Sequence, residues 1–223
     1  MKKIEKIRTL WTCRRELLLE NKIKIDFIAF QKEWRKQNSH NSTTAGCKFD
    51  INKVSVGDGT YGTLNIHCWD NPLEQIRIGS FCSIAEDVHF ILGGAHPLDR
   101  ITTFPYEQHI MGWSAEDPTG TKGPIIVEDD VWICYGATIL SGVTIGKGSV
   151  IGANSTIAKD IPPYSVVIDG KVARKRFSEE IIEKLLPLDL HHIAGIPDES
   201  TVREILHSVI TEDTIDDLTS KMS

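Results

Sequence analysis

Aliphatic residues recur at every sixth position between residues 127 and 162. These positions are all β-branched: Val127, Ile133, Ile139, Ile145, Ile151 and Ile157. A period of six fits neither the alternation of a half-buried strand nor the turn of an α-helix. The pattern therefore predicts a solenoid of short strands, whose inward side chains stack coil upon coil at about 4.8 Å.

Two further registers follow the same period. Small or aliphatic residues stand four positions after each repeat residue, at Val131, Ala137, Val143, Ser149, Ser155 and Ile161. Three positions after each stand Asp130, Gly136, Gly142, Gly148, Asn154 and Asp160. Gly, Asn and Asp tolerate positive φ or cap tight turns, so the pattern predicts a second inward position with little room and a turn just before it.

The period also appears upstream, at Ile78, Ile84 and Phe90. The next position in that register is His96, and the repeat stops there. A weaker stretch over residues 54–62 predicts an opening coil, interrupted by a loop that contains His67, Trp69 and Pro72. Residues 97–124 are too many for a solenoid turn, and a loop of that length in a compact repeat is typically functional or a partner contact.

Both ends of the chain have a different pattern. From Lys2 to about Gln37, apolar residues at spacings of three and four predict helices, as a packing or oligomer contact or, alternatively, a membrane-surface helix. The polar run 38–44 predicts a linker.

After the repeats, Pro162 and Pro163 are expected to close the solenoid. Ser178 then provides an N-cap before an acidic first turn and predicts a helix there. A second short helix is predicted over roughly residues 198–210.

Composition narrows the class of protein. A hydrophobic content of 40% is enough for a core, and a net charge of −6 gives no general reason to bind nucleic acid. The five cysteines lack CxxC spacing, so neither a disulfide framework nor a zinc ribbon is indicated. Charges interrupt the first apolar residues, which excludes a signal-peptide core or a membrane span there. We expect a soluble, cytoplasmic protein without a nucleic-acid partner or a transmembrane segment.

Several motifs resemble those of a known family. They are Ile78–Ile84, Gly93–Asp99, Thr103–Tyr106, Asp130–Ile133, Gly142–Gly146 and Lys159–Pro163. Over roughly residues 50–185 the sequence is similar to the hexapeptide-repeat, left-handed β-helix acyltransferases, in the xenobiotic branch that includes chloramphenicol and streptogramin acetyltransferases. The segment from His96 to Asp99 also resembles the active-site stretch of galactoside and maltose acetyltransferases.

The resemblance implies an all-β fold, a left-handed parallel β-helix with helical appendages at both ends. A helical extension and linker would cover residues 1–45, the acyltransferase domain 46–176 with a protruding loop at 97–124, and C-terminal helices 177–223. It also implies a homotrimer with active sites between neighbouring subunits, and acetyl-CoA as co-substrate without a metal.

Site residues are implied position by position. The CoA contacts of the family fall on Trp132, Tyr135, Ala153, Ala158, Lys159 and Arg174. Lys175, Arg176 and Lys171 extend the basic run near the end of the solenoid, which would suit the phosphates of CoA. Asp99, Tyr61 and Tyr106 are assigned to the acceptor. The sequence departs from the family where Val172 replaces a proline near the CoA tail and where Cys134 replaces a glycine.

The chemistry places the histidine at the centre. A thioester is already activated, so the acceptor hydroxyl needs a general base near neutral pH, and His96 suits that role. Transfer is expected to be direct, without an acyl-enzyme. Gly93 and Gly94 would let backbone approach the ligand and place an amide at the oxyanion. Asp99 would either orient the imidazole or hold the acceptor.

Two alternatives belong to other classes of protein. One is a zinc protein like the γ-class carbonic anhydrases, using His67, His89 and His96, although the spacing of that family is absent. The other is a non-catalytic β-helix scaffold.

The acceptor is predicted from the ends of the chain. The N-terminal extension is more similar to that of surface-polysaccharide O-acetyltransferases than to compact resistance enzymes. The tryptophan-rich stretch of the latter is replaced by residues 188–192. A sugar or surface-polysaccharide hydroxyl, or its precursor, is therefore favoured over an antibiotic such as chloramphenicol or a streptogramin.

Overall fold

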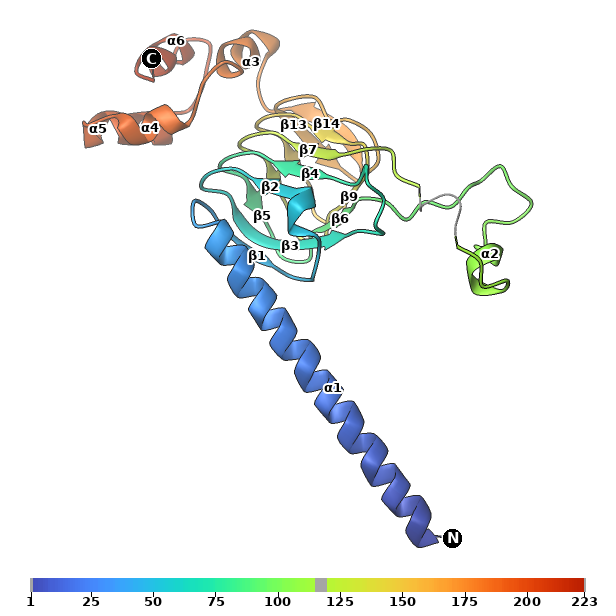
Figure 1. Ribbon diagram of the computed structural model, residues 1–223. Helices are drawn as coiled ribbons and strands as arrows, with labels where there is room; N and C mark the ends of the chain where they lie inside the picture. The colour runs from blue at the N-terminus through green and yellow to red at the C-terminus, as the bar shows by residue number, and fades with distance from the viewer. Residues whose placement is uncertain (1, 115–119, 223) are drawn as a thin grey trace.

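The repeats build a three-sided prism of parallel strands, from which a long helix, an arm and a group of short helices extend (Figure 1). The computed structural model describes residues 2–114 and 120–222, with side chains from Glu16 onward within those ranges. Residues 115–119 of the predicted loop and the side chain of Cys13 lie outside this description.

Each side of the prism is one stack of hydrogen-bonded strands. The first face holds β2 (Val54–Val56), β4 (Ile76–Ile78), β7 (Ile125–Val127) and β10 (Thr144–Ile145). The second face holds the start of β3 (Tyr61–His67), β5 (Ser83–Ile84), β8 (Trp132–Ile133), β11 (Val150–Ile151) and β13 (Ser165–Ile168). The third face holds the end of β3, β6 (His89–Ile91), β9 (Thr138–Leu140) and β12 (Thr156–Ile157).

The predicted inward positions form the core. Val127 pairs with Ile145, Ile133 with Ile151, and Ile139 with Ile157, so one full coil takes eighteen residues. All repeat residues from Ile78 to Ile157 are at most 3% exposed, and the second inward register is at most 5% exposed. Each such aliphatic side chain contributes about 1.5–3 kcal/mol of burial free energy. The prediction of a solenoid of short, stacked strands with a six-residue repeat is confirmed.

The turn register behaves as predicted at five of its six positions. Asp130, Gly136, Gly142, Gly148 and Asn154 have φ between 57° and 77°. Asp160 does not adopt positive φ, and its carboxylate instead accepts the backbone N–H of Thr144 at 2.8 Å. The chain therefore turns at five corners through a positive φ and at the sixth with the help of a capping hydrogen bond.

The prism ends later than the prolines predict. Past Pro162 and Pro163 the chain turns at Tyr164, whose φ is 54°, and continues the second face as β13. Strand β14 (Lys171–Lys175) then folds back antiparallel on β13. The pair of prolines does not close the solenoid, because prolines stand in the corner, where no ladder hydrogen bond from their nitrogen is needed.

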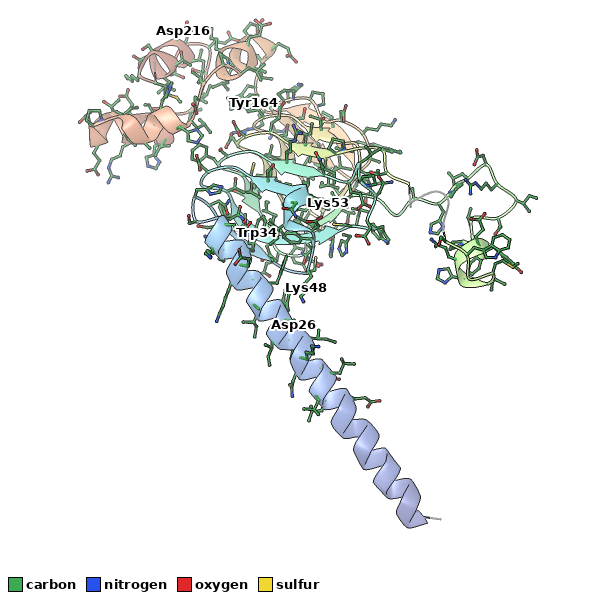
Figure 2. The ribbon with its side chains drawn as sticks, in the orientation of Figure 1. Asp26, Trp34, Lys48, Lys53, Tyr164 and Asp216 are labelled. Atoms are coloured by element: carbon green, nitrogen blue, oxygen red, sulfur yellow. The ribbon has the colours of Figure 1, made fainter. Side chains whose placement is uncertain are left out.

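The N-terminal segment forms one continuous helix, α1 (Lys2–Gln37), which projects away from the prism (Figure 1). Its last turns pack on the opening coil through Trp34, which is fully buried and contacts Phe49 edge-on at 5.2 Å (Figure 2). After α1, strand β1 (Ser42–Ala45) pairs parallel with β3. Arg35 secures this polar run by donating to the carbonyls of Asn41 and Thr43 at 2.7 and 2.9 Å.

The C-terminal segment contains four short helices, α3 (Glu179–Leu185), α4 (His191–Gly195), α5 (Glu199–His207) and α6 (Ile215–Ser220). Helices α3 and α5 begin where the sequence predicted. Asp198 caps α5 by accepting the N–H of Thr201 at 2.9 Å, whereas the Ser178 side chain makes no capping bond at α3. Within the residues that the structure describes, every helix is too short or too polar to cross a lipid bilayer.

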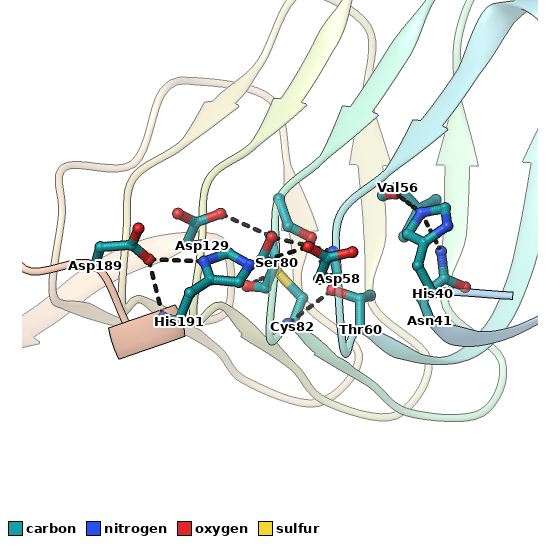
Figure 3. A network of polar contacts seen from close by, with 11 residues as sticks. His40, Asn41, Val56, Asp58, Thr60, Ser80, Cys82, Asp129, Asp189 and His191 are labelled. Atoms are coloured by element: carbon teal, nitrogen blue, oxygen red, sulfur yellow. Dashed lines mark hydrogen bonds and ion pairs between the residues drawn. The ribbon is translucent and has the colours of Figure 1, made fainter. Parts of the chain in front are cut away.

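His191 links the C-terminal segment to the prism (Figure 3). Its Nδ1 lies 2.7 Å from Asp189 and its Nε2 lies 3.1 Å from Asp58, which belongs to the opening coil. The imidazole ring also packs on the ring of Phe81, with 4.7 Å between the two ring centroids. The bond to Asp189, and then that to Asp58, raises the pKa of His191, while bonds from His191 lower the pKa of Asp189.

We predict that this contact weakens as pH rises. Because the pKa of folded His191 is raised, its contribution to stability is complete below the ordinary histidine pKa and disappears as pH rises through the raised value. Hydrogen exchange of residues 187–196, corrected for intrinsic rates, should show protection falling through that window. In His191→Gln the protection should be lower and independent of pH; an unchanged pH profile in that variant would contradict the assignment.

Candidate active site

An arm leaves the prism between β6 and β7 (Figure 1). His96 lies at the root of this arm, shortly after β6 ends at Ile91. The two limbs of the arm are joined where Ala95 and Gly120 exchange backbone hydrogen bonds of 3.0 and 2.9 Å. The short helix α2 (Tyr106–His109) lies further out. His96 follows directly after this bridge, so a rigid two-bond contact fixes the backbone from which the imidazole extends.

A hollow of about 1080 Å³ lies within the arm. Its lining residues are Trp69, Gly94, Ala95, His96, Pro97, the run 99–109 and Gly120. Three of the residues predicted for the site, His96, Asp99 and Tyr106, therefore share one space. Sequence reasoning did not assign Trp69 to the site, although its position in the loop that interrupts the opening coil was a signal.

His96 is exposed, and so is Asp99. In the described ranges no hydrogen bond or ion pair joins these two side chains. The imidazole is accessible to a ligand in the hollow, and Asp99 lines the same hollow rather than holding the ring in place.

The two glycines before the histidine permit close approach of the chain's own side chains. A Cβ at Gly93 would lie 2.2 Å from Oε1 of Glu74, and one at Gly94 would lie 3.0 Å from the ring of Trp69. Gly94 also has a φ of 84°, in the left-handed region. Larger residues at these positions would displace the turn that presents His96.

Tyr61 lies elsewhere, on the second face of the prism. In the register of that face it pairs with Ser83, Ser83 pairs with Trp132, and the row continues through two valines to Arg174. Tyr61 and Trp132 are each 53% exposed. The structure thus places Tyr61 in a row with two predicted CoA contacts, and not among the residues that line the His96 hollow.

The other predicted CoA contacts lie at corners of the prism. Tyr135 and Ala153 occupy equivalent corners of successive coils, where the N–H of Asn154 donates to the carbonyl of Tyr135 at 2.8 Å. Ala158 and Lys159 follow β12, at the next corner. All four are exposed. Together with the row on the second face, the predicted CoA contacts lie on one face and at two corners of the prism.

The cations after β13 differ in their surroundings. Arg174 is exposed, whereas Lys175 donates from Nζ to the carbonyl of Pro163 at 2.9 Å. Arg176 donates to the carbonyl of Gly148 at 2.6 Å and lies over the ring of Tyr164. Arg176 is therefore a structural residue, although its place in the basic run suggested a phosphate contact.

The histidines of the zinc alternative do not converge. His67 and His89 lie side by side on the third face, with Nε2 of His67 3.0 Å from Nδ1 of His89, and His89 contacts Asp87 at 3.1 Å. Burial, and then the neighbouring His89, lowers the pKa of His67. Across the described residues, no three His, Cys, Asp or Glu side chains are grouped as ligands for one ion.

Among the side chains that the structure describes, four cysteines are free thiols: Cys47, Cys68, Cys82 and Cys134. Burial raises the pKa of Cys82 to about 11, which keeps this thiol protonated and unreactive. Cys134, at the position of the expected glycine, is half-buried beside the corner that holds Tyr135, and burial raises its pKa as well.

The fold is a parallel β-helix built on six-residue repeats, and comparison with known proteins agrees with that class. The six-repeat hexapeptide pattern of bacterial transferases matches residues 124–159. A probable macrolide acetyltransferase of Lysinibacillus sphaericus is 43% identical over 129 residues, which cover 55% of this chain and 72% of that protein. A chloramphenicol acetyltransferase of Escherichia coli is 40% identical over 124 residues, covering 52% of this chain but only 59% of the relative.

Among solved structures, a hexapeptide-repeat acetyltransferase from Vibrio cholerae is similar, with 26% identity and a TM-score of 0.47, over 62% of this chain and 72% of its own. The chain belongs to the hexapeptide-repeat acetyltransferases, of the group that includes chloramphenicol and macrolide acetyltransferases. It is an acetyltransferase, and membership of this family implies that the coil is left-handed.

Proposed function

We propose that the protein transfers an acetyl group from acetyl-CoA to a hydroxyl of a sugar, a surface polysaccharide or a polysaccharide precursor. The observation that carries this proposal is the exposed imidazole of His96 in one hollow with Asp99 and Tyr106, at the root of an arm on the hexapeptide prism. Membership of the acetyltransferase family supports acetyl-CoA as the donor.

In this mechanism His96 acts as a general base. Its neutral ring nitrogen accepts the proton of the acceptor hydroxyl while the hydroxyl oxygen bonds to the thioester carbonyl carbon. The C–S bond then breaks, and the imidazolium returns the proton to the departing thiolate. The products are the acetyl ester and CoA, with His96 neutral again.

The row on the second face is the proposed path of the CoA. Trp132, the Tyr135 and Ala153 corners, and Ala158 would contact its pantetheine and adenine parts. Lys159 and Arg174 are exposed cations and would meet its phosphates through charge-assisted hydrogen bonds. Lys175 would join them by adding a phosphate contact to its bond with the Pro163 carbonyl. The exposure of Trp132 and Arg174 in one row supports this path.

The arm supports a homotrimer in which each site lies between neighbouring subunits. Leu98 is 89% exposed and Trp113 is 59% exposed, and Ile101 is fully exposed. Apolar side chains gathered on one projecting segment are typical of a surface that another protein covers. The proposed organisation is a helical extension over 1–45, the catalytic prism over 46–176 and helices over 177–223, in a cytoplasmic enzyme.

The lining of the hollow supports a sugar acceptor. Its lining includes both polar groups, from Asp99, Thr102 and Thr103, and the aromatic rings of Phe104 and Tyr106. Hydroxyls of a sugar pair with such polar groups, while its C–H faces pack on aromatic rings. An antibiotic acceptor is the second candidate, because relatives at 43% and 40% identity are named for macrolides and chloramphenicol.

A screen of acceptors tests the proposal directly. CoA release from acetyl-CoA would be measured with monosaccharides, oligosaccharides, purified surface polysaccharide, chloramphenicol, a macrolide and a streptogramin. We expect turnover with a sugar or glycan and ester formation detectable by mass spectrometry. Turnover with an antibiotic alone would replace the sugar proposal by the second candidate.

The role of the histidine predicts a large rate effect. His96→Ala should lower kcat by about 10²–10⁴-fold, because the acceptor loses its general base, with little change in thermal unfolding. His207→Ala, an exposed histidine on α5, is the matched control and should keep full activity. Near-normal turnover by His96→Ala would remove this residue from the mechanism.

Two neighbouring arginines should separate binding from stability. Arg174→Ala should raise the KM for acetyl-CoA by about tenfold, because a charge-assisted phosphate contact is lost, and should leave unfolding unchanged. Arg176→Ala should instead lower the free energy of unfolding by about 1–3 kcal/mol, because it strands the Gly148 carbonyl and Asp130. Kinetics and urea unfolding of both variants check this; equal effects would contradict the assignment.

A further inference from the structure

A buried ion pair supports the loop between β3 and β4, outside the residues that the proposed mechanism uses. Glu74 is fully buried, and both of its carboxylate oxygens lie 3.0 Å from the backbone nitrogen of Trp69. Lys53, in the opening coil (Figure 2), places Nζ 3.2 Å from Glu74 and 2.9 Å from the carbonyl of Asn71. The Glu74 carboxylate and the Lys53 ammonium group thus hold the loop at two backbone positions, the nitrogen of Trp69 and the carbonyl of Asn71.

This loop contacts the root of the arm. The Glu74 carboxylate lies against Gly93, and the six-membered part of the Trp69 indole lies against Gly94, at the distances that allow no side chain there. His96 follows two residues later, after Ala95, which is bridged to Gly120. The turn that presents the imidazole is therefore held by the Gly120 limb of the arm and by the Trp69 ring.

Trp69 also faces the ligand space. Its side chain lines the hollow with His96, and the residue is 43% exposed. One part of the indole supports the backbone before the histidine, and another part is available to a molecule bound in the hollow. An aromatic ring in this position offers a flat apolar surface beside the polar groups of Asp99 and Thr102.

We propose that Trp69 is a specificity-determining residue that forms one wall of the acceptor site, and that Glu74 and Lys53 are positioning residues that fix it. This inference rests on the proposed function, since it assigns the hollow beside His96 to the acceptor. The acceptor class that fits is a pyranoside or another ring with one apolar face, which packs on the indole while its hydroxyls meet the polar rim.

The ion pair suits a positioning role. A buried carboxylate is costly without a partner, and a buried pair gives little net stability compared with apolar packing of the same volume. The Glu74 carboxylate instead fixes the orientation of the loop between β3 and β4, because both of its oxygens accept the N–H of Trp69. A change that loosens this contact moves the wall of the hollow and the turn before His96 together.

The test compares two conservative substitutions, Trp69→Phe and Glu74→Gln, with Trp69→Ala, which removes the aromatic ring. Trp69→Phe, Trp69→Ala and Glu74→Gln would be assayed with the best acceptor from the screen and with a small primary alcohol, at varied acetyl-CoA. Glu199→Gln, an exposed carboxylate on α5, is the control for Glu74→Gln. Thermal unfolding of every variant gives the folded fraction.

We expect Trp69→Ala to raise the KM for the ring acceptor about three- to tenfold while the KM for acetyl-CoA changes less than about twofold. The ratio of kcat/KM between ring acceptor and small alcohol should fall by a similar factor, and Trp69→Phe should restore most of it. Glu74→Gln should lower kcat roughly 10- to 100-fold at an unchanged folded fraction, because the turn before His96 is less well positioned.

Two results overturn the inference. If Trp69→Ala leaves the ratio between the two acceptors unchanged, Trp69 is not a wall of the acceptor site. If the loss of activity in every variant follows its folded fraction, Glu74 and Trp69 act only on stability. Trp69→Phe and Glu74→Gln make this comparison possible even if Trp69→Ala unfolds. If the wild-type protein were inactive with every acceptor, the proposed function itself would be contradicted. Failure of the proposed function can therefore be distinguished from failure of the role assigned to Trp69 and Glu74.

Discussion

The structure depends on one constraint, the stacking of β-branched side chains along the axis of the prism. Each repeat residue must lie directly on the residue one coil below, eighteen positions away, because the backbone ladders fix the spacing of the coils. This leaves no freedom inside the prism for catalytic groups. Every element that carries chemistry therefore lies outside it, on an outward face, at a corner or in an insertion.

The sequence predicted this scaffold well because its signals are local and repeated. The inward registers follow from residue type alone, and so does the positive φ at five of the six predicted turn positions. The end of the prism was less predictable: Pro162 and Pro163 resemble a stop, but a proline in a corner costs no ladder bond, and β13 continues beyond it. Likewise, nothing local distinguishes Arg176, held by the Gly148 carbonyl, from exposed Arg174.

The candidate site was predictable in part. His96 stood out because an imidazole replaced an aliphatic residue at the end of a repeat, and Asp99 and Tyr106 lie in the same hollow. Tyr61 does not, because strand register carries it to the second face. Trp69 and Glu74 were missed because their contacts with Gly93 and Gly94 join segments that are distant in the chain, and no periodic pattern records such a meeting.

The bridge between Ala95 and Gly120 separates the arm from the prism with two hydrogen bonds. The described residues beyond it, up to 114, lie outside the eighteen-residue repeat, so the arm can change its length or its side chains without shifting a coil. Proteins built on this scaffold can thus vary the arm while the coils stay the same, because one tie between two backbone positions isolates the long loop from the repeat.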